Sequence, residues 1–570
     1  MGLSMLFHAK NRAKIMDFIL ARYVFPKYLC SPKLHHRTKM TETHAYSLYE
    51  ILKETTTKQP ERTVLTYFGI NLTYNTLLDR IDETANAFRK QGIGQGDIVS
   101  VSLPTMPESV MCFYALHKIG AIPCMIDVRY TPEQMCEIVD RTRSKMLFIM
   151  GFCCKSWAKT KVKINVDKVV VCSGADSIPG VSFWYGIGEW FNGRKKVFLK
   201  NKKFCHWKDF IKTAQGKDNA EAYHWRPDEM TALFQTSGTT GTVKSVMLST
   251  ENILHSIYPE PPVLNNIQSE DSVICLLPIF AFYGANAVML ALSHGMRAIV
   301  IPIATKEAFL KLIVKHKPQH VFSVPAYWDI IAQEKDNQDD FSFLKTANIA
   351  GDVLTAAFEH SINDFLHERG CRYDVTKAYG MTETAGVISF TPQGSPHQYE
   401  PGFSGKAVGG YEVKTFDDEL CVRSDAKILG YYKNEEATRN LLQTHDGSLW
   451  LHTGDMGRVD EEGNIFVIGR KKRMIVRHDG SKVFPVEIED CLTQHPSVAA
   501  CAVIPMQDPD HSESKLPKAF VVLKETKATI EELMAFCKDN LPEHLVPEAI
   551  EFIDALPMNA NGKVDYQKLI

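Results

Sequence analysis

Hydrophobic residues recur at helical spacing in two segments near the start of the regular part of the chain. In residues 47–59 the apolar side chains of Leu48, Ile51 and Leu52 share one face, and residues 74–90 show the same spacing over a longer stretch. Short runs rich in apolar and β-branched residues predict strands at 64–67, 72–74, 97–101 and 122–126.

Strands and helices alternate further along the chain. A helix is expected over 108–119, and strand-like runs recur at 298–302, 320–324 and 348–349. This alternation predicts an α/β fold with mostly parallel sheets. No repeat of fixed period is present.

The pattern changes after the sequence GRKK at 469–472. Beyond it, strands are expected at 474–476, 498–504 and 519–523, and helices from Pro485 and over 529–540. This predicts a compact α+β unit large enough to fold separately. We therefore expect a basic N-terminal extension at 1–39, a large domain at 40–470 and a small domain at 471–570.

Composition narrows the function classes. A chain of 570 residues is too long for one core, so two to four domains are expected. The formal net charge of −2 argues against a nucleic-acid binder. None of the fourteen cysteines forms a CxxC pair, which predicts reduced thiols, a cytoplasmic location, and neither disulfides nor a zinc site. No apolar run is long enough to span a membrane.

The first 39 residues carry eight basic side chains against one acid, Asp17. Asp17 and Arg22 interrupt the apolar run at 15–25, which argues against a signal peptide. Peripheral membrane contact through a surface helix is one interpretation. A helix that packs on the body, or a poorly ordered lead-in, is the other.

The segment Leu233–Ser249 reads LFQTSGTTGTVKSVMLS. Its glycines permit close approach of backbone N–H groups to an anion, its hydroxyls add donors, and Lys244 adds a charge. The segment is not a Walker A loop, because GxxxxGK[ST] is absent. The pattern predicts a hairpin tip or a loop that binds a polyphosphate; a flexible polar turn between strands is the alternative.

Three further segments suit nucleotide chemistry. In AYGMTET at 378–384, Tyr379 suits stacking on a base and Glu383 suits Mg²⁺, although a strand end with a polar turn has the same composition. In WLHTGD at 450–455, Asp455 suits accepting two ribose hydroxyls from a buried loop, and an Asx turn is the alternative. Near the end, the turn NANGK presents Lys563, which could equally be a solvated surface lysine.

Together these motifs resemble a known family. TSGTTGTVKSV, YGMTE, HTGD, GRKKRMI, FPVEIE and NGKVD occur in one order. With earlier segments such as LTYNTLLDRID, the resemblance covers residues 40–570 and points to the adenylate-forming superfamily of acyl-CoA synthetases, peptide-synthetase adenylation domains and luciferases. It implies a large adenylate-forming domain of layered sheets and helices and a small mobile α+β domain.

The resemblance implies a two-step reaction that uses ATP, Mg²⁺ and CoA. A carboxylate attacks the α-phosphate of ATP, and a thiol then displaces AMP. Catalytic roles fall to Lys563, to Thr382 at the phosphate and to Glu383 as the metal ligand. The implied nucleotide-binding residues are Thr236, Ser237, Gly238, Thr239, Thr240, Gly241, Lys244, Gly351, Asp352, Tyr379, Gly380, Met381, Asp455 and Arg470.

Two positions are implied to serve domain movement. Lys472 matches the family's hinge, and the Gly480 loop would serve the thiol step on the CoA side. The sequence VRHDG at 476–480 is one residue longer than in many relatives. Arg477 and His478 could therefore contact CoA phosphates or belong to a solvated turn.

The acid-binding wall is expected at LLPIFAFYG, residues 276–284, with Ser323–Tyr327 as a second wall. Ala281 stands where the family often has His. The wall offers no carboxylate for a substrate ammonium, and a buried ammonium without a partner is costly. This favours an apolar, fatty-type acid, although the residues could be ordinary core. The expected substrate-binding residues are Phe280, Ala281, Phe282, Tyr283 and Val324.

The expected thiol is CoA, because no carrier segment follows before Ile570. The alternative within the same chemistry is a free-standing ligase that loads a carboxylic or amino acid onto a separate carrier protein. Luciferase-type oxygenation has no positive support in these residues.

Overall fold

The computed structural model describes residues 47–178, 202–237, 243–332, 334, 338–511, 514–524, 527–557 and 564–569. The basic extension at 1–39, the loop residues Gly238, Thr239, Thr240 and Gly241, and Lys563 lie outside these ranges. What the sequence predicts for them therefore stays a prediction. Every helix in the described part of the chain is too short or too polar to cross a bilayer.

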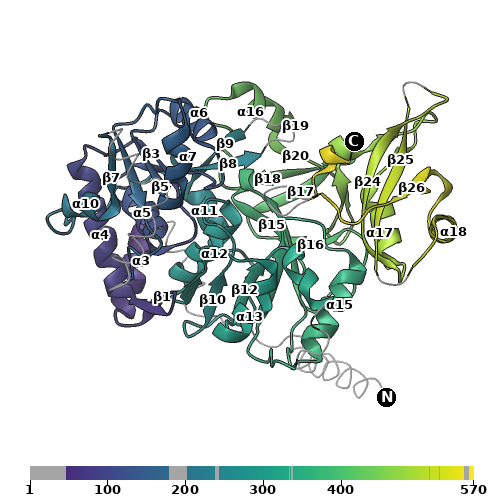
Figure 1. Cartoon of the computed structure of the whole chain (residues 1–570), viewed down its shortest axis with the longest axis horizontal. Coiled ribbons are helices and arrows are strands. Elements are labelled where there is room, and N and C mark those ends of the chain that lie inside the picture. Colours follow the sequence, from purple (N-terminus) through teal and green to yellow (C-terminus); the bar gives the residue numbers. More distant parts are fainter. Residues whose placement is uncertain are drawn as a thin grey trace, which may run out of the picture. The chain divides into compact units, whose positions relative to one another are not determined.

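One sheet has seven strands and is parallel except for its last pair (Figure 1). Its short apolar strands are largely buried, as expected for parallel strands covered by helices on both faces. The last two strands pair antiparallel, so the segment 233–249 takes the hairpin form, one of the two forms expected from the sequence. The order is β7 (Phe204–His206), β6 (Lys168–Cys172), β5 (Met146–Met150), β3 (Ile98–Ser102), β4 (Ile122–Met125), β8 (Met230–Ser237) and β9 (Val243–Ser249).

The second sheet has fourteen strands and changes character along its width. One half is mainly parallel, with an antiparallel strand at its edge: β14 (Thr376–Met381), β13 (Thr346–Ala350), β12 (His320–Ser323), β10 (Ser272–Cys275), β11 (Arg297–Val300), β1 (Thr63–Tyr67) and β2 (Ile70–Thr73). The other half is antiparallel: β15 (Gly386–Phe390), β16 (Phe403–Ala407), β21 (Asn464–Arg470), β20 (Ser448–Val459), β18 (Glu419–Ser424) and β17 (Tyr411–Phe416), with β19 (Leu442–His445) paired to β20.

Two helices are buried almost all round because each packs between other elements. Helix α5 (Pro107–Lys118) packs on β3 and β4, and α12 (Phe282–Ser293) packs on β10 and β11. Both helices contribute to one apolar core that also takes residues from the two sheets. Close packing explains Gly284, where an added Cβ would lie 2.3 Å from the carbonyl oxygen of Pro278.

The predicted helices near the start are confirmed. Helix α3 (Leu48–Lys58) begins after Ser47, whose hydroxyl accepts the Glu50 N–H, and α4 (Tyr74–Lys90) is capped by Thr73. In the described residues up to 441, the other α-helices are α6 (Pro132–Thr142), α7 (Cys154–Lys159), α10 (Trp207–Lys212), α11 (Thr250–Ile257), α13 (Lys306–His316), α14 (Pro325–Trp328), α15 (Ala356–His367) and α16 (Glu435–Leu441). The α/β fold class is therefore confirmed.

The residues after 470 form a smaller α+β arrangement with its own apolar core. The expected strands and helices are present, and a third strand, β26, joins the sheet parallel to β25. The elements are β22 (Ile475–Val476), β23 (Lys482–Val483), α17 (Pro485–Gln494), β24 (Val498–Gln507), β25 (Lys515–Leu523), α18 (Ile530–Asn540) and β26 (Ala549–Phe552). The domain boundary at 470–471 stays a prediction.

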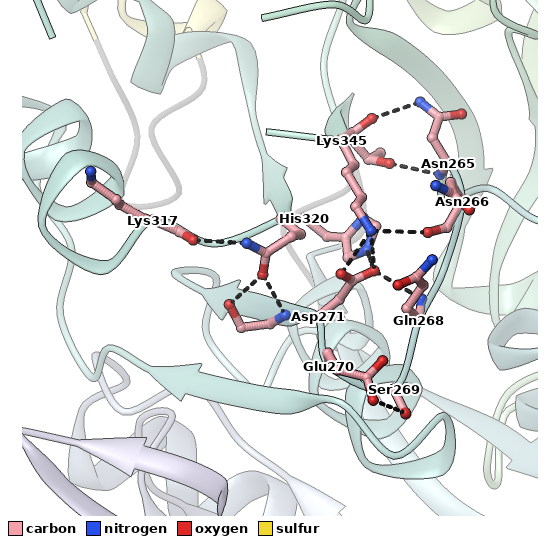
Figure 2. A network of polar contacts seen from close by, with 12 residues as sticks. Asn265, Asn266, Gln268, Ser269, Glu270, Asp271, Lys317, His320 and Lys345 are labelled. Atoms are coloured by element: carbon pink, nitrogen blue, oxygen red, sulfur yellow. Dashed lines mark hydrogen bonds and ion pairs between the residues drawn. The ribbon is translucent and has the colours of Figure 1, made fainter. Parts of the chain in front are cut away.

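A polar network holds the amino ends of β10, β12 and β13 together (Figure 2). Asp271 lies 3.0 Å from the Nε2 of His320 and accepts a hydrogen bond of 2.8 Å from Lys345. Burial works to raise the pKa of Asp271, but these two partners outweigh it and lower the pKa. The strands are parallel, so their opposite, carboxyl ends present Val324 and Gly351 together.

Candidate active site

The β8–β9 hairpin places Thr236 and Lys244 opposite each other just before its tip. Both residues are half-buried. The ammonium of Lys244 lies 4.7 Å from the centre of the Tyr431 ring, a cation–π distance. The hairpin therefore holds the positive charge of Lys244 against the segment that carries Tyr431.

Tyr431 joins this hairpin to Glu383. The chain around Tyr431 pairs with β9: the N–H of Met247 donates to the carbonyl of Gly430, and the N–H of Tyr432 donates to the carbonyl of Ser245. The Tyr431 hydroxyl donates to Oε1 of Glu383 at 2.6 Å. Burial, and then the nearby Glu383 carboxylate, raise the pKa of Tyr431 well above its ordinary value, so it remains a donor.

Glu383 lies in a single 3₁₀ turn, Thr382–Thr384, directly after β14. Glu383 is 9% exposed as a whole residue, whereas Thr382 is half-buried. Gly380 permits this path, because a Cβ there would lie 1.9 Å from the carbonyl oxygen of Gly386 on the paired strand. The YGMTE segment is thus a strand end followed by a turn, as the sequence allowed.

Asp455 is the centre of a second polar group. Tyr379 donates to its Oδ2 at 2.8 Å, and the Arg470 guanidinium lies 2.9 Å from its Oδ1. Arg470 also donates to the carbonyl of Thr453. Burial and the adjacent Asp455 raise the pKa of Tyr379 well above its ordinary value.

The structure corrects the predicted setting of Asp455. HTGD is not a loop: Asp455 lies within β20 and pairs with Arg470 on β21. Within this strand Gly454 has a φ of +74°, a backbone conformation that glycine adopts without steric cost. The register of the two strands explains why residues fifteen apart in the sequence form an ion pair.

Glu419, which the sequence did not single out, contacts the residues next to Asp455 and Arg470. Its Oε1 accepts the N–H of Gly454 at 2.9 Å, and its Oε2 lies 2.9 Å from Lys471 and 3.2 Å from His452. Burial works to raise the pKa of Glu419, but Lys471 and then His452 outweigh it and lower the pKa. Glu419 thus ties the Asp455 segment to the turn Lys471–Arg473.

The expected acid-binding residues lie at the carboxyl ends of β10 and β12 and the start of α12. Tyr283 donates to Oδ1 of Asn348 at 2.8 Å. A Cβ on Gly351 would lie 3.7 Å from Val324, so these two positions are neighbours. Phe280 is buried, with the Arg129 guanidinium 5.7 Å from its ring, and Ala281 is half-buried.

Two of the predicted positions have particular local settings. The ring of Phe282 packs edge-on against Phe234 at 5.2 Å, in the manner of a core residue. Asp352 is exposed beside Gly351, and its Oδ1 accepts the N–H of Val353.

The predicted hinge and CoA-side loop lie close together in the chain. Lys472 is exposed in the turn Lys471–Arg473, and Gly480, with a φ of +82°, closes the turn between β22 and β23. Arg477 donates to the carbonyl of His544, so part of its bonding capacity is used within the protein.

The segment that carries Lys563 has described residues on both sides. The N–H of Asp565 donates to the carbonyl of Pro557 at 2.7 Å, which brings the two sides together. Beyond it, the Tyr566 ring lies 3.7 Å from the Arg473 guanidinium. The chain that follows Lys563 is therefore anchored beside the Lys471–Arg473 turn.

The donor set suits magnesium. Mg²⁺ prefers oxygen ligands and is usually held by one or two carboxylates together with substrate phosphates. Glu383 supplies one buried carboxylate, already oriented by Tyr431, and Thr382 adds a neighbouring hydroxyl. These residues fit a single Mg²⁺ that is completed by a nucleotide.

The structure brings Tyr379, Asp455 and Arg470 into direct contact, and it connects Lys244 to Glu383 through Tyr431. Sequence reasoning missed Tyr431 and Glu419. Each is one of many residues of its type, and neither belongs to a spacing pattern that implies a role. Only strand pairing reveals them.

Comparison with known proteins gives matches over almost the whole chain. A family model described as AMP-binding enzyme matches residues 52–432, and one described as AMP-binding enzyme C-terminal domain matches residues 487–563. A putative acyl-CoA synthetase of Bacillus subtilis is 28% identical over 560 residues, covering 93% of this chain and 97% of the relative. A long-chain-fatty-acid–CoA ligase of the same species is 26% identical over 550 residues, covering 92% and 94%.

A solved structure shares the fold. The crystal structure of an anthranilate CoA ligase in complex with anthranoyl-AMP superposes with a TM-score of 0.78 at 24% identity. The match covers 92% of this chain and 96% of that chain.

Proposed function

The chain belongs to the AMP-binding enzyme family, and from this premise we propose that it is an ATP-dependent ligase that joins a carboxylic acid to CoA. The acid is activated as an acyl-adenylate with release of pyrophosphate, and CoA then displaces AMP. We further propose that the acid is apolar and of the fatty type.

One observation carries this proposal: β14 and the turn after it connect a group of side chains that suits ribose to a group that suits phosphates and a metal ion. Tyr379 on the strand contacts Asp455, which suits the ribose hydroxyls. Four residues later, Glu383 contacts Tyr431, whose ring lies under Lys244 of the hairpin. A nucleotide with its ribose at Asp455 would direct its phosphates toward Glu383 and Lys244.

In the first step, a carboxylate oxygen of the acid attacks the α-phosphorus of ATP. The bond from that phosphorus to the oxygen that bridges the α- and β-phosphates breaks, and this oxygen leaves with pyrophosphate. We assign Lys563 to the negative charge that develops at the α-phosphate, because a positioned ammonium stabilises that state more than the ground state. Lys244 and Thr236 hold the departing phosphates. Mg²⁺, held by Glu383, would supply charge neutralisation at these phosphates.

In the second step, the CoA sulfur attacks the acyl carbonyl carbon, the bond to the AMP oxygen breaks, and the thiol proton passes to solvent. We assign Lys472 as the hinge at the predicted domain boundary and the Gly480 turn to the CoA side. The contacts that support these assignments are those of Glu419 with Lys471 and of Arg473 with Tyr566. They anchor both sides of the Lys471–Arg473 turn.

The preference for an apolar acid rests on the residues from Phe280 to Tyr283. Their side chains are aromatic or aliphatic and offer no carboxylate for an α-ammonium group. Burying an ammonium without a partner costs several kcal/mol or shifts its protonation. An apolar chain or ring avoids that cost. The fatty-acid ligase among the relatives is consistent with this preference.

The test is pyrophosphate and AMP release with a panel of acids, with and without CoA. We expect octanoate or palmitate to support CoA-dependent AMP release at least tenfold faster than anthranilate or 4-coumarate. Faster turnover of the aryl acids would overturn the fatty preference but retain the ligase. Amino-acid-dependent exchange of pyrophosphate into ATP, without CoA dependence, would favour loading of a carrier protein instead.

A further inference from the structure

Two loops in the last hundred residues bring together three side chains that suit a metal ion. His478 lies in the turn between β22 and β23, whereas Asp508 and His511 follow β24. One ligand atom from each residue lies within 4.8 Å of the other two. No other group of three such side chains was found within the described ranges. The three residues are far from Glu383 in the sequence and belong to none of the contacts described above.

The carboxylate of Asp508 is fixed by its own loop. Its Oδ1 accepts the N–H groups of Asp510 and His511 at 3.0 and 3.2 Å, and the residue is 5% exposed. Its Oδ2 lies 3.5 Å from Nδ1 of His511, longer than a usual N–H···O hydrogen bond. Oδ2 therefore faces the imidazole without a short bond to it.

The two imidazoles lie side by side. Their ring centres are 4.2 Å apart and their planes differ by 11°. Both histidines are exposed, so their side chains can rotate without repacking a core. Zinc binds imidazole nitrogen and carboxylate oxygen at about 2.0–2.2 Å, so two ligands of one ion lie at most about 4.4 Å apart. A movement of roughly 1 Å by the exposed rings would bring all three ligands to such distances.

We propose that His478, Asp508 and His511 form a binding site for a transition-metal ion of the Zn²⁺ class. Two imidazoles and one carboxylate suit Zn²⁺, Co²⁺ or Ni²⁺, whereas Mg²⁺ prefers oxygen ligands alone. Three protein ligands leave a fourth position for water. The bound ion links the turn that contains Gly480 to the loop after β24.

The sequence alone does not reveal this site. His478 and His511 are 33 positions apart, and neither belongs to a metal-binding spacing. The cysteine pattern predicted no zinc site, and this one uses no cysteine. Antiparallel pairing within β22–β23 and β24–β25 defines the two loops that carry the ligands.

The test measures Zn²⁺ binding to the tag-free full-length chain, without nucleotide, by competition with a chromophoric chelator. The variants are His478→Gln, His511→Gln and Asp508→Asn. His544→Gln, which alters another exposed histidine of the same part of the chain, is the matched control. We expect one ion per wild-type chain, bound at least tenfold more weakly by each of the three variants and unchanged in the control.

Hydrogen exchange supplies a second readout. Zn²⁺ is expected to slow exchange in peptides covering 477–481 and 508–511 of the wild type, and not in His478→Gln. Because His478 is exposed, this variant is expected to fold, and an unchanged thermal midpoint without metal checks that. Wild-type affinity in all three variants, or no binding by the wild type above that of the triple variant, would overturn the site. Neither readout depends on the ligase activity.

Discussion

Tyr431 donates a hydrogen bond of 2.6 Å to the carboxylate of Glu383, across 48 positions of sequence. The same tyrosine pairs through its backbone with Val246 of the β8–β9 hairpin, and its ring lies under the ammonium of Lys244. One side chain therefore sets the position of the proposed metal ligand relative to the proposed phosphate site.

Replacing Tyr431 with Phe removes only the hydroxyl. Hydrogen bonds to charged groups contribute about 1.5–3 kcal/mol, so we expect roughly 10- to 100-fold slower adenylation, or an equivalent rise in the Mg²⁺ concentration needed. Pyrophosphate release measured against Mg²⁺ concentration checks this. Tyr432→Phe is the matched control. Wild-type Mg²⁺ dependence and rate in Tyr431→Phe would show that the bond has no role in the reaction.

Asp455→Asn retains the shape of the side chain but loses its charge. The amide offers one acceptor oxygen where the carboxylate serves Tyr379, Arg470 and, as proposed, the ribose. We expect the KM for ATP to rise at least tenfold, with a smaller change in kcat. Asp460→Asn, at the end of the same strand region, tests for a general effect of lost charge. An unchanged KM for ATP in Asp455→Asn would remove Asp455 from the nucleotide site.

Lys563→Ala is expected to separate the two half-reactions. Loss of a positioned charge-stabilising group costs on the order of 10²–10³-fold in rate. We expect that loss in acyl-adenylate formation and little change in thioester formation from supplied acyl-adenylate. Lys568→Ala removes a neighbouring exposed lysine and is the control. Equal losses in both half-reactions would contradict the assignment.

Lys472→Pro restricts φ at the proposed hinge. We expect thioester formation to slow more than adenylation, because only the second step requires the swing that delivers the CoA side. Lys472→Ala removes the charge while leaving the backbone free, so it separates the two effects. Single-turnover measurements of adenylation and of thioester formation in each variant show which step is slowed. If Lys472→Pro slowed both steps to the same extent, Lys472 would not be acting as a hinge.

His117 gives a pH dependence of stability. It is fully buried, with Nε2 3.1 Å from the hydroxyl of Thr250, and burial lowers its pKa from 6.5 to about 3. The folded pKa lies below the unfolded one, so the unfolded state takes up the proton first as the pH falls. The stabilisation is therefore complete above about pH 6.5 and is lost progressively between 6.5 and 3.

We expect His117→Gln to lose about 2 kcal/mol less stability than the wild type between pH 7 and pH 5. Urea unfolding at the two pH values measures the difference. His544→Gln, which changes an exposed histidine, should retain the wild-type pH dependence. An identical pH dependence in His117→Gln and the wild type would mean that His117 is not neutral in the folded protein.

Helices and parallel strands were predictable because their signal is local. In α4, apolar residues at 3.6-residue spacing and the cap at Thr73 lie within the segment itself. β3 and β4 are short apolar runs, each within one residue of its predicted range. In contrast, β26 reads AIEF and has no alternation or flanking signal to distinguish it from a loop. Its pairing with β25 defines it as a strand.

By itself, the sequence determined the α/β class and the motifs that point to Glu383, to Asp455 and to the segment 233–249, which contains Lys244. Those residues lie in contiguous segments whose composition already suits phosphates, a metal and ribose. Only the tertiary structure placed Asp455 in a strand beside Arg470. It also revealed the hydrogen bonds from Tyr431 to Glu383 and from the Gly454 N–H to Glu419. These contacts join residues up to 48 positions apart through strand register, and register depends on how whole sheets pack rather than on any local pattern.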